Sequence, residues 1–220
     1  MGQKINPKVF RLGNLFTWSS RWFADDKQYK DLILQDVKIR KALVTKLRTA
    51  GISQIEIERS INKIDITLHV SRPGVVIGRG GAGLEEVKKF LGNLLVPTNK
   101  EDQKSPSKLK LEIKVEPIKE ANLDAYLVAQ NIAEQLAKRL PQRRVANVTM
   151  DKVMSAGAKG IKIVLSGRIG GADISRRETY KTGMMPLSTL RENIDFASYP
   201  SLTRSGYIGV KVWICKNSLK

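Results

Sequence analysis

Six consecutive residues, Gly78–Gly83, are the ones best suited by type and spacing to hold a phosphate group. Their sequence, GRGGAG, formally matches G-x-G-x-x-G, the turn that binds a dinucleotide in βαβ folds. That turn needs a buried parallel strand before its first glycine, whereas only Val75–Ile77 follow the break at Pro73. It also needs an acidic residue at the end of the next strand, but Glu101 and Asp102 come before that strand. A lone match is weak evidence, so the sequence does not favour a dinucleotide site.

The shorter run Gly78-Arg79-Gly80-Gly81 supports a different chemistry. A G-x-x-G turn between two helices lets the backbone approach a single-stranded sugar-phosphate chain, of which it holds about four nucleotides. Arg79 adds a positive charge, and the N-terminus of the helix that follows favours anions. The apolar residues Val75–Ile77 before the turn would give bases a surface to rest on. A plain tight turn is the alternative interpretation.

The elements predicted on either side of this turn form a recognisable order. Apolar residues at helical spacing predict a helix over residues 32–50. Strict alternation predicts a β-hairpin over residues 55–70 with one buried face, and His69 falls on its polar, solvated face. A helix follows the glycine turn, then a polar loop at 96–108 and a strand over residues 109–117. The order helix, strand, strand, glycine-rich turn, helix, strand resembles the type II KH domain, a family of RNA-binding modules.

The second half of the chain predicts a different domain. Residues 123–140 have strong helical spacing, and Pro141 both stops that helix and opens the next, which runs to about Ser155. A strand over residues 160–168, a glycine-rich turn and two or three further strands follow, the last at 207–216.

The predicted fold class is therefore α+β, in three parts. The first is a basic and aromatic N-terminal arm (residues 1–24), the second a type II KH domain (25–118) and the third a C-terminal α/β domain (119–220). We expect the KH domain to have a three-stranded sheet with helices on one face. We expect the C-terminal domain to have two helices on a mostly antiparallel sheet.

The net charge of the chain restricts its partners most strongly. The sequence carries 39 Lys and Arg against 21 Asp and Glu, a net charge of +18. Such a surface repels itself unless a polyanion covers it, and the candidates are nucleic acid and an anionic membrane. No apolar run approaches the roughly 18 residues that a membrane span needs, so we expect nucleic acid and no membrane. The N-terminus has no apolar signal core, which makes the cytoplasm the expected compartment.

The sequence contains only one cysteine, Cys215, and one histidine, His69. This excludes a disulfide framework and nearly excludes a zinc site, which takes about four ligands. It also leaves no plausible nucleophile and base, and no paired carboxylates stand at a recognisable motif spacing. We therefore expect no enzyme activity, no metal, no cofactor and no small-molecule substrate.

Two groups of basic residues in the C-terminal half are candidates for contacts with RNA. Arg139, Arg143 and Arg144 lie around Pro141, and the last two fall in the first turns of a helix, where cations oppose the helix dipole. The local fold gains little from cations there, which indicates an external anion, although a solvated charge run is the alternative. The second group surrounds a glycine-rich turn and comprises Lys159, Lys162, Arg168, Arg176 and Arg177.

Short blocks along nearly the whole chain occur together in one known protein family. The N-terminal blocks are Gly2-Gln3-Lys4 with Pro7, Arg11-Leu12-Gly13 and Trp22-Phe23-Ala24. The remaining blocks are Arg72-Pro73-Gly74 with Ile77-Gly78, Gly157-Ala158-Lys159-Gly160-Ile161-Lys162, Ser166-Gly167-Arg168-Ile169-Gly170-Gly171-Ala172, Pro186-Leu187 with Thr189-Leu190-Arg191, and Gly209-Val210-Lys211-Val212-Trp213-Ile214. In residues and in order, they resemble the bacterial-type small-subunit ribosomal protein S three.

This resemblance implies a structural place in the head of the small ribosomal subunit. It implies three partners, which are ribosomal RNA, messenger RNA and neighbouring small-subunit proteins. It also implies that basic residues of the C-terminal domain line the channel by which messenger RNA enters, and help to unwind it. Arg143 and Arg144 match the family's unwinding positions, whereas Asn147 and Val148 stand where its basic run continues. The arm residues expected on ribosomal RNA are Gln3, Lys4, Lys8, Arg11, Trp18 and Trp22, unless the rings are buried in the protein.

A free KH-type RNA-binding regulator or a ribosome assembly factor is the alternative function. It would need only the glycine turn, and it would not account for the basic arm and the second domain together. An enzyme is supported only by the formal dinucleotide match. The sequence therefore predicts a non-catalytic component of the small ribosomal subunit.

Overall fold

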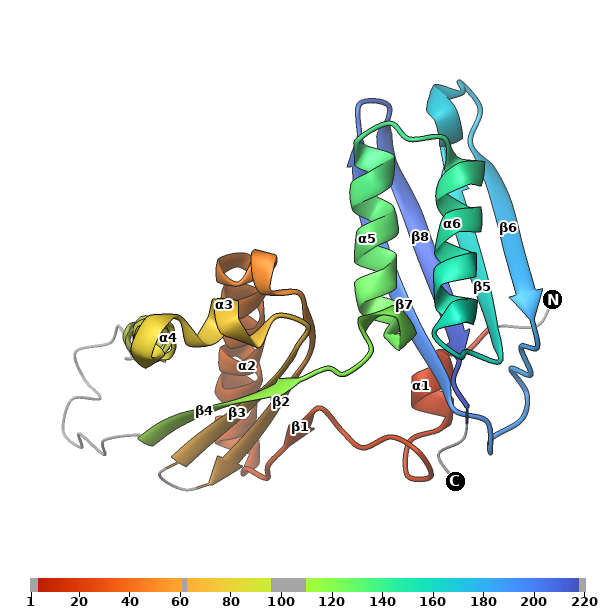
Figure 1. Cartoon of the computed structure of the whole chain (residues 1–220). Helices are drawn as coiled ribbons and strands as arrows, with labels where there is room; N and C mark the ends of the chain where they lie inside the picture. Colours follow the sequence, from red (N-terminus) through yellow and green to blue (C-terminus); the bar gives the residue numbers. More distant parts are fainter. Residues whose placement is uncertain (1–3, 61–62, 96–109, 218–220) are drawn as a thin grey trace. The chain divides into compact units, whose positions relative to one another are not determined.

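The computed structural model describes residues 4–60, 63–95 and 110–217, which fall into two compact units (Figure 1). One unit runs from Trp18 to Lys119, and the other joins the residues up to Thr17 to those from Glu120 onward. The residues of the predicted arm, 1–24, are therefore divided between the two units at Thr17. Gln3 and the predicted loop at 96–108 lie outside the described residues.

The unit from Trp18 to Lys119 packs its helices on one face of a four-stranded sheet. The strand order is β1-β2-β3-β4, with β2 and β3 antiparallel and the two outer pairs parallel. Alternating isoleucines of the hairpin, such as Ile57 and Ile66, meet Leu43 and Leu91 of the helices in one buried core. The elements are β1 (Ser20–Arg21), α2 (Asp26–Lys46), β2 (Ile52–Ser60), β3 (Lys63–Val70), α3 (Pro73–Ile77), α4 (Ala82–Leu95) and β4 (Lys110–Pro117).

The fourth strand of this sheet comes from the predicted arm. Ser20 and Arg21 pair in parallel with Ile57 and Glu58 of β2, which makes the sheet one strand wider than expected. The residue after β1, Trp22, is held by the buried carboxylate of Asp36. The Trp22 ring nitrogen and Arg59 Nε donate to this carboxylate at 2.9 and 2.8 Å. Trp22 is thus tied to its own domain, the outcome that the sequence left open beside an RNA contact.

The second unit covers one face of an antiparallel sheet with two helices. The strand order is β6-β5-β8-β7 and every pair is antiparallel. Asp124 begins α5 by accepting hydrogen bonds from the backbone N–H groups of Tyr126 and Leu127, at 2.9 and 3.1 Å. The elements are α1 (Pro7–Phe10), α5 (Ala125–Ala137), α6 (Gln142–Ser155), β5 (Gly160–Gly167), β6 (Arg176–Gly183), β7 (Ile194–Thr203) and β8 (Gly206–Cys215).

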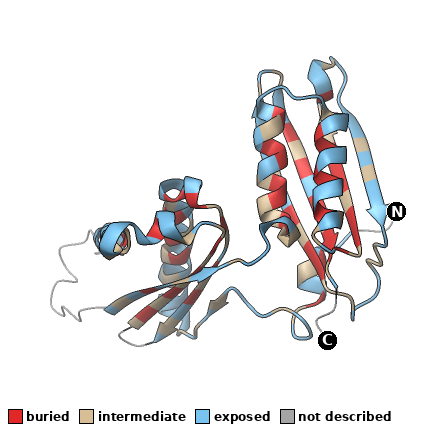
Figure 2. Ribbon diagram, in the orientation of Figure 1, coloured by how far each residue is buried: buried red, intermediate tan, exposed pale blue. Residues whose placement is uncertain are grey.

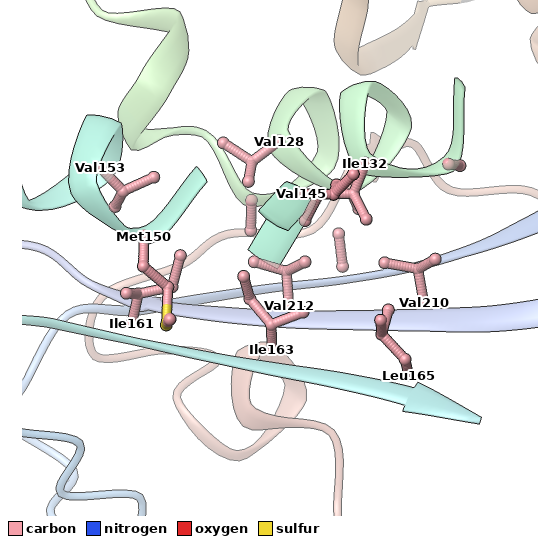
Figure 3. Close-up of a cluster of buried hydrophobic side chains, with 14 of the residues drawn as sticks. Val128, Ile132, Val145, Met150, Val153, Ile161, Ile163, Leu165, Val210 and Val212 are labelled. Carbon is pink, nitrogen blue, oxygen red and sulfur yellow. The ribbon is translucent and has the colours of Figure 1, made fainter. Parts of the chain in front are cut away.

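The core of this unit lies between the two helices and the sheet. Figure 3 shows Val145, Met150 and Val153 of α6 above Ile161 and Ile163 of β5. All three of these α6 side chains are buried. Figure 2 shows the buried positions gathered on the helices and the central strands, with the outer strand β6 largely exposed. None of the described helices is both long and apolar enough to cross a membrane.

A buried arginine, Arg11, fastens the N-terminal segment to this unit. Its side chain is fully buried and donates to the backbone carbonyls of Leu187, Thr189 and Glu192 at 2.8–3.0 Å. A fourth hydrogen bond reaches the carbonyl of Pro7 at 3.0 Å. The sequence placed Arg11 among the contacts to ribosomal RNA. The structure corrects that assignment, because Arg11 is fully buried and its guanidinium donates to four carbonyls of the protein itself.

A second buried charge, Asp195, lies close to the same segment. Its carboxylate pairs with Lys8 at 2.7 Å and Lys216 at 3.3 Å, and accepts from the N–H of Ala125 at 3.0 Å. Burial acts to raise the pKa of Asp195, but the two lysines and the N–H group together hold it below its ordinary value. The ionised carboxylate therefore connects α1, the start of α5 and the residue that follows β8.

Replacing Asp195 with Asn is expected to lower the free energy of unfolding by about 1–3 kcal/mol at pH 7. The folded pKa is depressed, so the stabilisation is present above the unfolded value of about 3.9 and is lost as the pH falls through the folded pKa. Urea unfolding at pH 7 and at pH 3 checks this. If the difference in free energy of unfolding between wild type and variant were as large at pH 3 as at pH 7, the predicted role of the ionised carboxylate would be wrong.

Candidate nucleic-acid interface

The glycine turn joins α3 to α4 and is exposed. Gly78, Gly80 and Gly81 have φ values of +70°, +60° and +84°, a backbone region that side chains rarely adopt. A Cβ on Gly78 would lie 2.9 Å from the Gly83 nitrogen, so that glycine is required by packing. A Cβ on Gly80 or Gly81 would meet nothing within 4 Å. The middle of the turn is thus open to a ligand that approaches the backbone.

The last glycine of the run, Gly83, has a structural role that the sequence pattern did not reveal. A Cβ there would lie 2.6 Å from the carbonyl oxygen of Val76, because α4 begins directly against α3. The third glycine of the formal dinucleotide motif therefore serves the packing of two helices. Its place in the first turn of the helix that follows the glycine run was the available signal.

Charge and apolar surface both border the turn. Arg79 lies inside it, is exposed and makes no ion pair among the residues that the structure describes. Val75 and Ile77 of α3 are 50% and 39% exposed, whereas Val76 between them is buried in the core. Two of the three predicted apolar residues are thus available as a surface for bases. These contacts are geometrically possible, and RNA contact at the turn stays a prediction.

The basic residues around Pro141 are exposed at the start of α6. Arg143 and Arg144 lie in its first turn, which contains no acidic residue, and no side chain caps the helix. Arg143 lies close to the hydroxyl of Tyr180, which donates to Glu178 at 2.6 Å. Burial and that hydrogen bond raise the pKa of Tyr180 to about 12, so the hydroxyl stays protonated near neutral pH. Arg143 and Arg144 thus add two positive charges to the positive end of the α6 helix dipole.

Arg139 lies apart from this pair, in a pocket at one end of the same unit. Its φ is +60°, and it lines a pocket of about 320 Å³ together with Arg168 and Arg204. Arg168 is already engaged, because it donates to the carbonyl of Ala172 at 2.8 Å and pairs with Asp173 at 3.3 Å. Arg204 escaped the sequence analysis because it stands alone in a hairpin turn, outside any basic run.

The second basic group, predicted around the glycine-rich turn, does not form one cluster of free charges. Lys159 pairs with Glu192 at 3.0 Å, and Arg176 pairs with Glu178 at 2.9 Å. Lys162 lies over the ring of Trp213, with its Nζ 5.5 Å from the centroid, and Arg177 is exposed. Lys162 and Arg177 therefore remain open to an anion, while Lys159 and Arg176 are neutralised within the protein.

The arm residues likewise have different environments. Lys4 is exposed and Trp18 is 68% exposed, so both are accessible to RNA. Lys8 is partly engaged with Asp195, and Arg11 and Trp22 serve the fold as described above. Of the predicted arm contacts that the structure describes, Lys4 and Trp18 are thus the ones most available to a partner. No group of three or more His, Cys, Asp or Glu residues suited to a metal occurs among the described residues.

Comparisons with known proteins agree with both units. A protein-family model described as "KH domain" matches residues 38–123, and one described as "Ribosomal protein S3, C-terminal domain" matches residues 132–214. The "Small ribosomal subunit protein uS3" of Finegoldia magna is 48% identical over 219 residues, which cover 100% of this chain and 85% of that protein. This chain belongs to the ribosomal protein S3 family.

Two further family members match this chain over the same number of residues. The proteins of the same description from Caldicellulosiruptor bescii and Bacillus cytotoxicus are 45% and 44% identical over 219 residues, covering 100% of this chain and 94% of each relative. Family membership confirms the predicted α+β fold with a KH domain and a C-terminal domain of helices on an antiparallel sheet. It also confirms the predicted role as a structural, non-enzymatic protein of the small subunit of the ribosome.

Proposed function

We propose that this protein binds ribosomal RNA and helps to form the channel by which messenger RNA enters the small subunit. Arg143 and Arg144 contact the incoming strand, with Arg139 beside them in sequence. The observation that carries this role is the exposed pair of arginines in the first turn of α6, a turn without an acid. Their position matches the unwinding positions of the family, which adds support from the resemblance.

The mechanism is electrostatic and follows from where the charges lie. Positive charge at a helix N-terminus adds to the partial charge of the unpaired backbone N–H groups. A single strand entering the channel presents phosphates to this site, and cations that hold those phosphates oppose re-pairing of the strand. The pair is therefore expected to matter where the message is folded, and to matter little where it is already single-stranded.

The glycine turn and the arm supply the proposed contacts to ribosomal RNA. At the turn, Gly80 and Gly81 leave the backbone accessible, and Arg79 adds charge beside it. On the arm, Lys4 and Trp18 are exposed, so one can pair with a phosphate and the other can stack on a base.

The double substitution Arg143→Ala and Arg144→Ala is expected to slow translation through a stable messenger hairpin by about fivefold or more, the effect of losing one phosphate contact at 0.1 M salt. Translation of an unstructured message should be unchanged. The measurement is single-turnover translation time on the two messages, using small subunits that contain the variant. The matched control is Lys119→Ala with Lys152→Ala, which removes the same charge from other exposed positions.

A gain of function is available one helical turn further along. Asn147 is exposed on α6, four residues after Arg143 and on the same face. Asn147→Lys is expected to shorten the delay at the hairpin, because it adds a cation to that face. Normal rates through hairpins in the double alanine variant would rule out the proposed role in the channel.

A further inference from the structure

The sheet of the C-terminal unit has a second face, opposite α5 and α6. Side chains alternate along a strand, so the residues between the core positions Ile161, Ile163 and Leu165 point to that second face. The register places Lys162 of β5 opposite Lys181 of β6 and opposite Trp213 of β8, and Trp213 opposite Phe196 of β7. One row across the sheet therefore holds two lysines and two aromatic rings.

The charge of this face is of one sign. The outward positions of β5, β6 and β8 carry Lys162, Arg177, Lys181 and Lys211, and no outward position of the four strands carries an acid. Like charges directly opposite one another destabilise a sheet. Burial is the main cause that lowers the pKa of Lys162, and the neighbouring cations Lys4, Arg177 and Lys181 lower it further. The fold thus maintains a concentration of positive charge that it does not itself neutralise.

The sheet of the other unit shows that this arrangement is not a general property of the chain. Its outward face carries acids and bases together, and they are paired. Arg21 pairs with Glu56 and Glu58 at 2.7 Å, and Lys63 pairs with Asp65 and Glu112 at 3.1 and 2.9 Å. The same chain therefore balances the charges of one open sheet face and leaves the other with cations and no acid.

The aromatic residues indicate which polyanion fits. The rings of Phe196 and Trp213 lie 5.0 Å apart between centroids at an angle of 39°, both are partly exposed, and Lys162 lies over the Trp213 ring. Surfaces that bind single-stranded nucleic acid combine cations that follow the backbone with aromatic rings that stack on bases. An acidic protein segment would pair with the cations but would not need the rings.

We propose that this face binds a single-stranded segment of RNA, with bases stacked on Trp213 and Phe196 and phosphates held by Lys162, Lys181, Lys211 and Arg177. The proposal deepens the RNA binding proposed above and rests on it. It assigns to the C-terminal sheet an interaction surface separate from the glycine turn and from the arginines of α6. The cations on β5 and β6 lie beside the rings and Lys211 lies on the same strand as Trp213, so the backbone can cross the sheet while its bases face the protein.

The first test removes two charges from the face in the full chain. Lys162→Gln with Lys181→Gln is expected to weaken binding of a 12-nucleotide oligouridine by about 25-fold at 0.1 M salt, and to reduce the log–log salt slope by about 1.4, as two lost phosphate contacts require. Fluorescence anisotropy of the labelled oligonucleotide gives both numbers. The matched control, Lys63→Gln with Lys114→Gln, removes the same charge from the balanced sheet face and should leave both unchanged.

The second test begins with the unmodified chain, so its first result does not depend on whether a variant folds. Ultraviolet cross-linking of the unmodified chain to the same oligonucleotide is expected to attach RNA to the peptide that contains Trp213. Trp213→Leu should weaken binding by about tenfold, the loss expected for one stacked base. No adduct on β8, together with unchanged affinity in the sheet variants, would overturn the proposal and leave the face to a protein partner. If variants of the glycine turn lose affinity in the same experiment, RNA binding itself still stands.

Discussion

Replacement of Arg11 by Met should lower the free energy of unfolding of the C-terminal unit by about 3–5 kcal/mol. Methionine has a similar length but no donor, so it leaves the four carbonyls of Pro7, Leu187, Thr189 and Glu192 without their partner. Each buried acceptor that loses its hydrogen bond costs about 1–3 kcal/mol, and partial hydration of some of them reduces the sum. Burial is also the main cause that lowers the pKa of Arg11, which reflects how completely the group is removed from water.

Hydrogen exchange in increasing urea measures this loss unit by unit, through peptides from β7 and β8 against peptides from β2 and β3. The unit from Trp18 to Lys119 should keep its stability, because all four carbonyl partners of Arg11 belong to the other unit. The matched control is Arg21→Met, which removes an exposed arginine whose ion pairs are worth about 1 kcal/mol or less. Equal, small effects of the two substitutions would contradict a structural role for Arg11.

The double substitution Gly80→Asp and Gly81→Asp should weaken binding of single-stranded RNA by about 30-fold. Both positions have open space where a Cβ would be added, so the new side chains meet no atom, and the strain of the positive φ is one that aspartate tolerates better than most residues. Each carboxylate near a phosphate costs about 1 kcal/mol in water, and two of them give that factor. Anisotropy with a labelled oligouridine at a fixed salt concentration measures the affinity.

The control for this substitution is Gly80→Asn with Gly81→Asn. The positive φ values of these two positions strain an asparagine about as much as an aspartate. The asparagine variant therefore reproduces the backbone strain without adding charge. Affinity should fall far less in the asparagine variant than in the aspartate variant. An equal loss in both would mean that the turn acts through its shape, and no loss in either would remove the turn from the interface.

The periodicity of the sequence was sufficient to predict the main elements. Alternating isoleucines predicted β2 and β3, which the structure places at Ile52–Ser60 and Lys63–Val70. Helical spacing predicted α5 and α6 on either side of Pro141, and membership of the ribosomal protein S3 family supports the assembly of these elements into two domains. Periodicity succeeds here because burial of one face is decided locally along each element.

The parts that could not be predicted depend on contacts between residues far apart in the chain. Arg11 looked like one more cation of a basic arm, and only the loop around Leu187 and Glu192 gives it carbonyl partners. The pairing of Ser20 with Ile57 likewise required the position of β2 to be known. Local patterns carry no information on such partners.

The open face of the C-terminal sheet illustrates the same limit at the candidate site. Lys162 and Arg177 were identified as basic residues, but Lys181 and Lys211 were not, because they belong to no run of charge. Strand order and register are what bring these four residues and Trp213 to one surface. A signal was present in β8, where Tyr207, Gly209, Lys211 and Trp213 alternate with buried apolar residues.

Sedimentation tests the central claim most directly, which is that this protein is an integral, RNA-bound component of the small ribosomal subunit. Cells are lysed in magnesium buffer, the lysate is run on a sucrose gradient, and the protein is followed with and without a high-salt wash. We expect the protein to migrate with the small subunit and to stay there after the wash. Its loss in high salt, or its presence only at the top of the gradient, would rule out an integral subunit protein and indicate a peripheral or free RNA-binding factor.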